Sequence, residues 1–134
     1  MLFMLPKPLG KSVLEKSVLR KDVFFKKPYA HCGLGEYALY LGTEVVECNR
    51  YLPFASINRV YKRIEMPAGM DPRMAFMGGG TYYLVVEYDD GETKQYKFPR
   101  EAPLEKLLDA MQTKTTVLVG APYDKASAFG VKED

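Results

Sequence analysis

The one histidine of the chain, His31, is followed directly by Cys32, and a Cys–His pair can supply an activated thiolate nucleophile. Adjacent residues of a strand point to opposite faces of a sheet, so these two side chains would not meet. No third group that could orient the histidine is identifiable from the sequence. We therefore predict no enzymatic activity and no catalytic residue.

Metal and cofactor chemistry lacks donors with suitable spacing. A single imidazole excludes a two-histidine metal site, and Cys32 and Cys48 lack metal-ligand spacing and are too few for a disulfide scaffold. Both are expected to be reduced thiols. An acidic run, Glu87, Asp89, Asp90 and Glu92, matches no calcium-loop pattern. Its Asp90-Gly91 pair is explained as a hairpin turn. We predict no metal and no cofactor.

Phosphate-binding and nucleic-acid-binding patterns are incomplete. The glycine run 78–80 precedes an expected strand rather than a helix, so it lacks the context of a phosphate loop. Basic residues flank Tyr61, an arrangement found on nucleic-acid-binding surfaces: Arg59, Lys62 and Arg63. Glu65 follows on the same face and the whole chain carries a net charge of only +2, which favours a solvated sheet face. No nucleic-acid partner and no small-molecule substrate is expected.

Two features point to binding instead. Residues 1–30 contain seven basic and two acidic residues, a local charge of +5, which leaves −3 on the remainder. The stretch 66–80 is rich in Gly, Pro and Met, and such long loops are often functional. Methionines adapt to varied partners, although they could equally cover an open end of the sheet. The candidate partner or membrane contacts are Met66, Met70, Met74, Phe76, Met77, Lys26 and Lys27.

The elements that would position these residues are mainly strands. Residues 1–20 are expected to form an arm or short edge strand, or a basic arm that contacts an anionic surface. Strands are then predicted over 23–27, 36–41, 44–51, 57–65, 81–89, 92–98 and 115–119. The strand 57–65 breaks the period of two, which a bulge would explain.

One helix is predicted, over residues 103–111. Leu104, Leu107, Leu108 and Met111 fall at i, i+3, i+4 and i+7, which makes one apolar stripe that must be buried against the sheet. Pro103 suits the first helical turn.

Three stretches resemble the pleckstrin-homology-like fold, including its bacterial and GRAM-type relatives. They are a strand–turn–strand at 37–48, an aromatic-x-Pro step into the next strand at 51–60, and a strand–Asp-Gly–strand–helix unit at 82–111. The resemblance implies a half-open barrel of about seven antiparallel strands capped by one C-terminal helix, without catalytic machinery. Family members bind phosphoinositides, peptides or proteins. The loop expected between the first two strands, 31–36, contains no Lys or Arg, so the basic phosphoinositide motif is absent.

These observations predict a mainly β protein with three parts: an N-terminal arm (1–20), a PH-like domain (21–112) and a C-terminal strand and tail (113–134). No stretch reaches the length of a signal peptide core or a membrane span, so a cytoplasmic protein is expected. We expect a non-enzymatic binding or scaffolding module that mediates protein–protein contacts or self-association. The alternative is a peripheral binder of anionic membrane lipids, acting through the basic N-terminal segment and the Met-rich loop.

Overall fold

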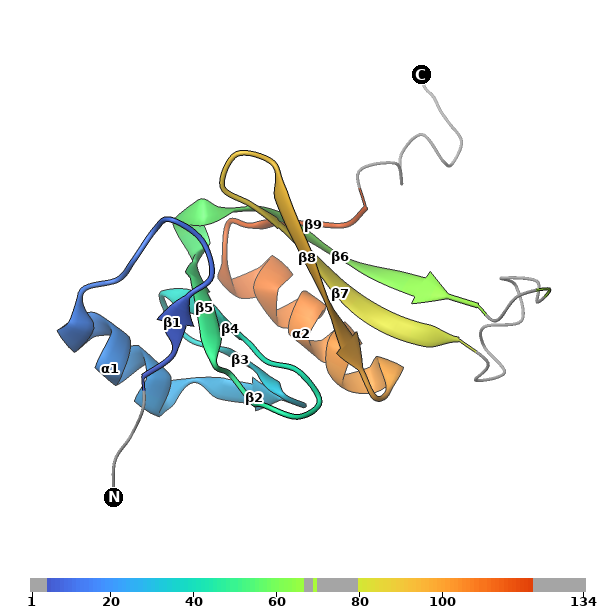
Figure 1. The fold of residues 1–134 in the computed structure, drawn as a ribbon, viewed down its shortest axis with the longest axis horizontal. Helices are drawn as coiled ribbons and strands as arrows, with labels where there is room; N and C mark the ends of the chain where they lie inside the picture. Colours follow the sequence, from blue (N-terminus) through green and yellow to red (C-terminus); the bar gives the residue numbers. More distant parts are fainter. Residues whose placement is uncertain (1–4, 67–68, 70–79, 122–134) are drawn as a thin grey trace.

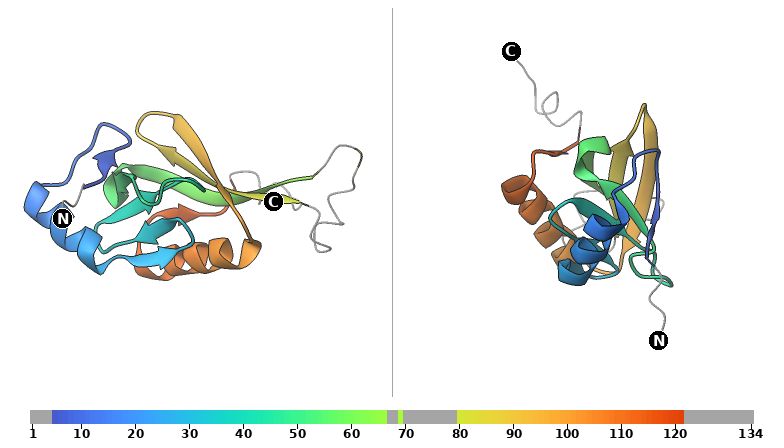
Figure 2. Two further views of the ribbon diagram at one scale, coloured as in Figure 1. Left: turned by 60° about the horizontal axis from the view of Figure 1, so that its bottom comes forward. Right: turned by 90° about the vertical axis from the view of Figure 1, so that its left-hand side faces the viewer.

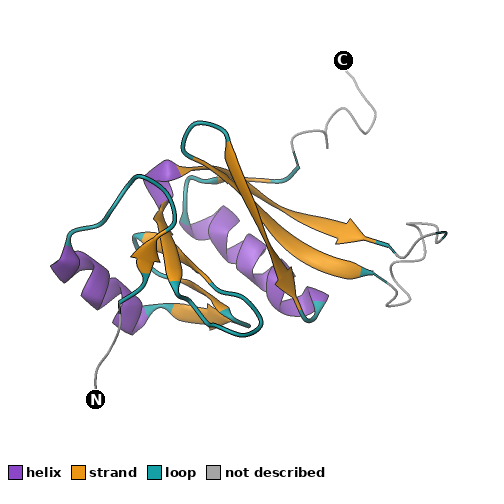
Figure 3. Ribbon diagram, in the orientation of Figure 1, coloured by secondary structure: helices purple, strands orange, loops and turns teal. Residues whose placement is uncertain are grey.

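The computed structural model describes residues 5–66, 69 and 80–121 as two β-sheets and two α-helices (Figures 1 and 3). In chain order the elements are β1 (Lys7–Pro8), α1 (Lys16–Phe25), β2 (Lys27–Tyr29), β3 (Cys32–Leu34), β4 (Ala38–Leu41), β5 (Arg50–Pro53), the 3₁₀ turn η1 (Phe54–Ser56), β6 (Ile57–Glu65), β7 (Thr81–Tyr88), β8 (Glu92–Phe98), α2 (Glu101–Lys114) and β9 (Leu118–Val119). The mainly β character predicted from the sequence is confirmed.

The first sheet has five strands in the order β1-β5-β4-β3-β2. Strands β2 to β5 form an antiparallel meander, and β1 pairs in parallel with β5. All four residues of β4 are buried because the strand is covered on both faces. Leu39 and Leu41 enter the main core, whereas Ala38 and Tyr40 pack in a second cluster with Leu19 of α1.

The second sheet has four strands in the order β8-β7-β6-β9. Strands β6, β7 and β8 are antiparallel, and β9 pairs in parallel with Arg59 and Val60 of β6. The register shifts between Ile57 and Arg59, which confirms the irregularity predicted within this strand. The β7–β8 hairpin is also confirmed, but its turn has three residues, 89–91, rather than two. Asp89 and Gly91 both adopt positive φ there.

Helix α2 closes the core that the two sheets share (Figure 2). Its buried residues are the four of the predicted stripe: Leu104, Leu107, Leu108 and Met111. The helix begins at Glu101, two residues before the predicted start, so Pro103 is its third residue. The first-turn N–H groups have no intrahelical acceptor, so a proline is accommodated at this position as well.

The prediction of a single helix is wrong, because residues 16–25 form α1 where an arm and a strand were expected. The boundary expected after residue 20 therefore falls inside a helix. Leu19 and Asp22 are buried three residues apart, which is a helical spacing. The strands form two separate sheets, and each sheet contains one parallel pair of strands, where a single set of antiparallel strands was expected. In the part of the chain that is described, neither sheet is closed into a barrel.

The returning strand predicted over 44–51 starts later than expected, because residues 42–49 form a loop and β5 begins at Arg50, antiparallel to β4. Thr43 organises its start: its backbone N–H donates to the Val46 carbonyl, and its Oγ1 accepts from the N–H groups of Val45 and Val46. A side-chain acceptor so close in sequence competes with strand pairing. Val45 and Val46 are consequently exposed, and Cys48 adopts a positive φ.

Candidate binding surfaces

Helix α1 presents an exposed face that combines aromatic and basic side chains. Phe24 and Phe25 are 79% and 77% exposed, and their rings meet edge to face with centroids 4.9 Å apart. Both line a hollow that also includes four basic side chains of this segment: Lys16, Arg20, Lys21 and Lys26. We call these six residues the α1 surface. None of its four cations has a carboxylate partner among the described residues.

Asp22 holds α1 in place from the opposite side of the helix. Its carboxylate, which is 5% exposed, accepts hydrogen bonds from the backbone N–H of Glu36 at 2.6 Å and that of Tyr37 at 3.2 Å. It also accepts one from the buried Tyr40 hydroxyl at 2.7 Å. Gly35 leaves room for this group, because a Cβ there would lie 2.2 Å from the Asp22 carboxylate. Asp22 and Leu19 thus mark the buried side of α1, and Phe24 and Phe25 lie exposed.

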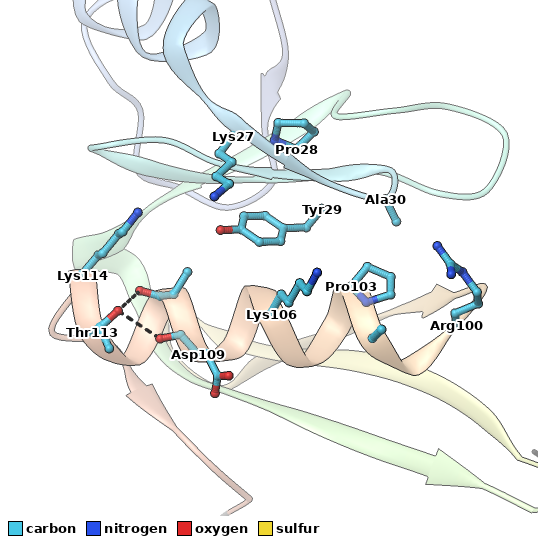
Figure 4. A pocket seen from close by; sticks show the side chains of 12 residues that line it. Lys27, Pro28, Tyr29, Ala30, Arg100, Pro103, Lys106, Asp109, Thr113 and Lys114 are labelled. Atoms are coloured by element: carbon cyan, nitrogen blue, oxygen red, sulfur yellow. Dashed lines mark hydrogen bonds between the residues drawn. The ribbon is translucent and has the colours of Figure 1, made fainter. Parts of the chain in front are cut away.

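A second surface is a groove between the edge strand β2 and helix α2, with a volume of about 670 Å³ (Figure 4). Four cations line it, Lys27 from β2 and Arg100, Lys106 and Lys114 from α2 and its N-cap. The one carboxylate along the groove, Asp109, points away from β2 in Figure 4. We call this site the α2–β2 groove.

The cations of the α2–β2 groove are not neutralised by the protein itself. Among the described residues none of them forms an ion pair, and Lys27 instead lies 5.9 Å from the centroid of the Tyr29 ring. The wall between the cations is apolar, formed by Pro28, the Tyr29 ring and Pro103. Thr113 contributes no free donor, because its hydroxyl bonds to the carbonyls of Asp109 and Ala110. The groove therefore offers positive charge around an apolar wall.

The structure separates the contact residues predicted from the sequence. Lys26 belongs to the α1 surface, with its Nζ 6.0 Å from the Tyr40 ring centroid, whereas Lys27 lines the α2–β2 groove. Met66 directly follows β6, and the C-terminal end of β6 lies at the opposite end of the molecule from α1 (Figure 1). The other four candidates lie outside the described residues: Met70, Met74, Phe76 and Met77.

His31 and Cys32 are both buried, and neither is available to a substrate in this structure. Burial raises the pKa of Cys32 to about 12, so its thiol stays protonated at neutral pH and is a poor nucleophile. The His31 ring lies 5.1 Å from that of Phe98, and its Nε2 has no hydrogen-bond partner among the described residues. Cys48 donates from its thiol to the His31 carbonyl, and burial raises the pKa of this thiol too.

The other charged clusters are occupied by internal contacts. Asp89 accepts a hydrogen bond from the Lys11 N–H at 2.9 Å, so part of the acidic run fixes the N-terminal segment to the hairpin. Lys62 pairs with both Glu101 and Glu105 of α2. Arg59 donates to the Gly120 carbonyl, and Arg63 lies over the Tyr83 ring. Within the described ranges no group of three His, Cys, Asp or Glu side chains could hold a metal.

The comparisons with known proteins give no relationship on which an assignment could rest. No protein-family model, no curated protein and no solved structure matches this chain. Both α-helices in the described part of the chain are too short or too polar to cross a bilayer. Function is therefore inferred from the two surfaces alone.

Proposed function

We propose that this protein is a non-enzymatic binding module that docks reversibly on anionic membrane surfaces through its α1 surface. The observation that carries the proposal is the pair of exposed rings, Phe24 and Phe25, among four cations that have no carboxylate partner. Interfacial helices combine these two features, since aromatic side chains enter the headgroup region while Lys and Arg attract acidic lipids. Because of this combination, we place membrane docking above the contact with a protein partner, which the sequence favoured.

The strength of such docking follows from the same residues. Each Lys or Arg close to an anionic leaflet contributes about 1 kcal/mol, and burying an exposed Phe contributes roughly 1.5–3 kcal/mol if burial is complete. With partial insertion, the gross attraction is on the order of 5–6 kcal/mol. That corresponds to an apparent dissociation constant of roughly 0.1 mM before immobilisation costs. The expected behaviour is weak, salt-sensitive and reversible association.

A PH-like relationship and a cytoplasmic location remain part of this proposal. Strands β2 to β8 are seven strands followed by a helix, and successive strands pair antiparallel within each sheet, which supports the resemblance. The turn between β2 and β3, Ala30-His31, is shorter than the expected loop and also contains no Lys or Arg. Docking through α1 does not require the phosphoinositide motif of that family. Both cysteines are free thiols, as a reducing compartment would leave them.

Vesicle sedimentation tests the proposal. The full chain should sediment with phosphatidylcholine vesicles that contain phosphatidylserine, and not with phosphatidylcholine alone. Binding should be lost at about 0.5 M salt, where the Debye length falls below roughly 5 Å. The double variant Phe24→Ser, Phe25→Ser should lose binding. The matched control Val45→Ser, Val46→Ser removes two exposed apolar side chains elsewhere and should retain it. Equal sedimentation of both double variants would contradict the proposal.

A second candidate, self-association, is favoured by the edge of β6. Strand β9 pairs only with Arg59 and Val60, and no described strand covers Lys62 to Glu65 on that side. Ile64 is 37% exposed there, and uncovered edges can pair with another copy of the same chain. Size-exclusion chromatography with light scattering would detect a dimer. A mass that stays monomeric at high protein concentration would exclude this candidate.

A further inference from the structure

We propose that the α2–β2 groove binds an extended acidic peptide segment of a partner protein. The site is separate from the α1 surface and does not depend on membrane docking. Its chemistry is set by the cations Lys27, Arg100, Lys106 and Lys114, which face the space between β2 and α2 (Figure 4). Because none of them has a carboxylate partner among the described residues, a ligand with several carboxylates would supply the missing countercharges.

The spacing of the cations requires an elongated ligand. Arg100 precedes α2 and Lys114 ends it, so they lie about 21 Å apart along the helix axis at 1.5 Å per residue. Lys106 lies between them, at about 9 and 12 Å. An extended peptide rises about 3.3 Å per residue, so about seven residues span the groove. Acidic side chains two and four residues apart share one face of an extended chain and would lie about 7 and 13 Å apart, within reach of successive cations on long, flexible side chains.

The walls of the groove favour a peptide over other polyanions. Pro28 and Pro103 contribute apolar surface that a peptide backbone and small side chains can cover. Single-stranded nucleic acid usually gains affinity by stacking its bases on accessible aromatic rings. Tyr29, the one aromatic residue of this lining, is only 7% exposed and offers no open face for stacking. A single phosphate is too small to contact both ends.

Fluorescence anisotropy with the full chain tests this assignment. The probe is a labelled peptide of about eight residues with Glu at its first, third and seventh positions and Ala and Ser between them, so that all three carboxylates share one face of the extended chain. The comparison peptide has Gln at those three positions. The double variant Lys106→Glu, Lys114→Glu should weaken binding of the Glu peptide at least about ten-fold, because two attractions become two repulsions. The matched control Lys94→Glu, Lys97→Glu changes the net charge equally on β8, outside the groove.

The control is suitable because both β8 lysines are exposed. Lys97 pairs with Glu44 at 3.6 Å, but such a surface ion pair contributes little to the stability of the fold. Tight binding by this control and loss in the groove variant support the proposal. It is overturned if the Gln peptide binds as well as the Glu peptide, or if both double variants weaken binding equally. Displacement of the peptide by an equimolar oligothymidylate, or by inorganic phosphate at the peptide's concentration, would assign the groove to another anion and equally overturn it.

Discussion

Replacing Asp22 by Asn tests whether one buried carboxylate holds α1 against the first sheet. The substitution keeps the shape of the side chain but removes its charge and one of its two acceptor oxygens. The carboxylate accepts from three donors, the N–H groups of Glu36 and Tyr37 and the hydroxyl of Tyr40. Hydrogen bonds to charged groups contribute about 1.5–3 kcal/mol and neutral ones about 1 kcal/mol. We therefore expect a loss of about 2–3 kcal/mol in the free energy of unfolding.

Urea denaturation followed by far-ultraviolet circular dichroism measures this loss. The control Asp109→Asn changes an exposed carboxylate on α2 and should shift stability by less than about 0.5 kcal/mol. Tyr40→Phe removes only the hydroxyl, and a double-mutant cycle with Asp22→Asn should give a coupling energy of about 1 kcal/mol. If Asp22→Asn costs less than about 1 kcal/mol, the carboxylate is not the anchor of α1 and the reasoning is refuted.

Three further predictions concern the core. Leu107→Ala should lower the unfolding free energy by about 2–5 kcal/mol, because the side chain is fully buried; a loss below about 0.5 kcal/mol would contradict its role. His31→Leu should be neutral or stabilising by about 1 kcal/mol in the same assay, since it removes a buried nitrogen without a partner, and a large loss would reveal a partner. Unfolded Cys32 loses its proton near pH 9.0 while the folded thiol keeps it to about pH 12. Stability should therefore fall as pH rises above 9, by at most about 1.4 kcal/mol per pH unit for this group, and less steeply in Cys32→Ala.

The sequence predicted the C-terminal half of the fold well because its signals are local and consistent. In the hairpin, alternating Tyr and Leu/Val residues flank an Asp-Gly turn, and in α2 a stripe with period 3.6 follows directly. Each pattern determines its own element, and the stripe alone determines which face of the helix is buried. The buried residues of α2 were consequently all identified.

The same reasoning failed for α1 because its buried face includes a charged residue. Asp22 occupies a helical stripe position with Leu19, but a carboxylate is normally assigned to the solvent side. The adjacent pair Phe24-Phe25 then has the appearance of a buried strand, although in the structure both rings lie outside. A signal was present in the spacing of Leu19, Asp22 and Val23, which is i, i+3 and i+4. Recognising it requires the partner N–H groups of residues 36 and 37, which lie more than a dozen positions away.

The two candidate surfaces differ in how far sequence could reveal them. The α1 surface is continuous in the chain, so its charge was visible as the basic segment 1–30, and only the direction of its two rings was missing. The α2–β2 groove joins Lys27 to residues more than 70 positions later, and each of its cations alone resembles an ordinary surface lysine or arginine. These four cations form a site because α2 packs beside the edge strand β2. This packing brings them around one apolar wall that has no carboxylate paired with them. Periodicity indicates which face of an element is buried. Which side chains of other elements lie next to its exposed face is decided by tertiary packing.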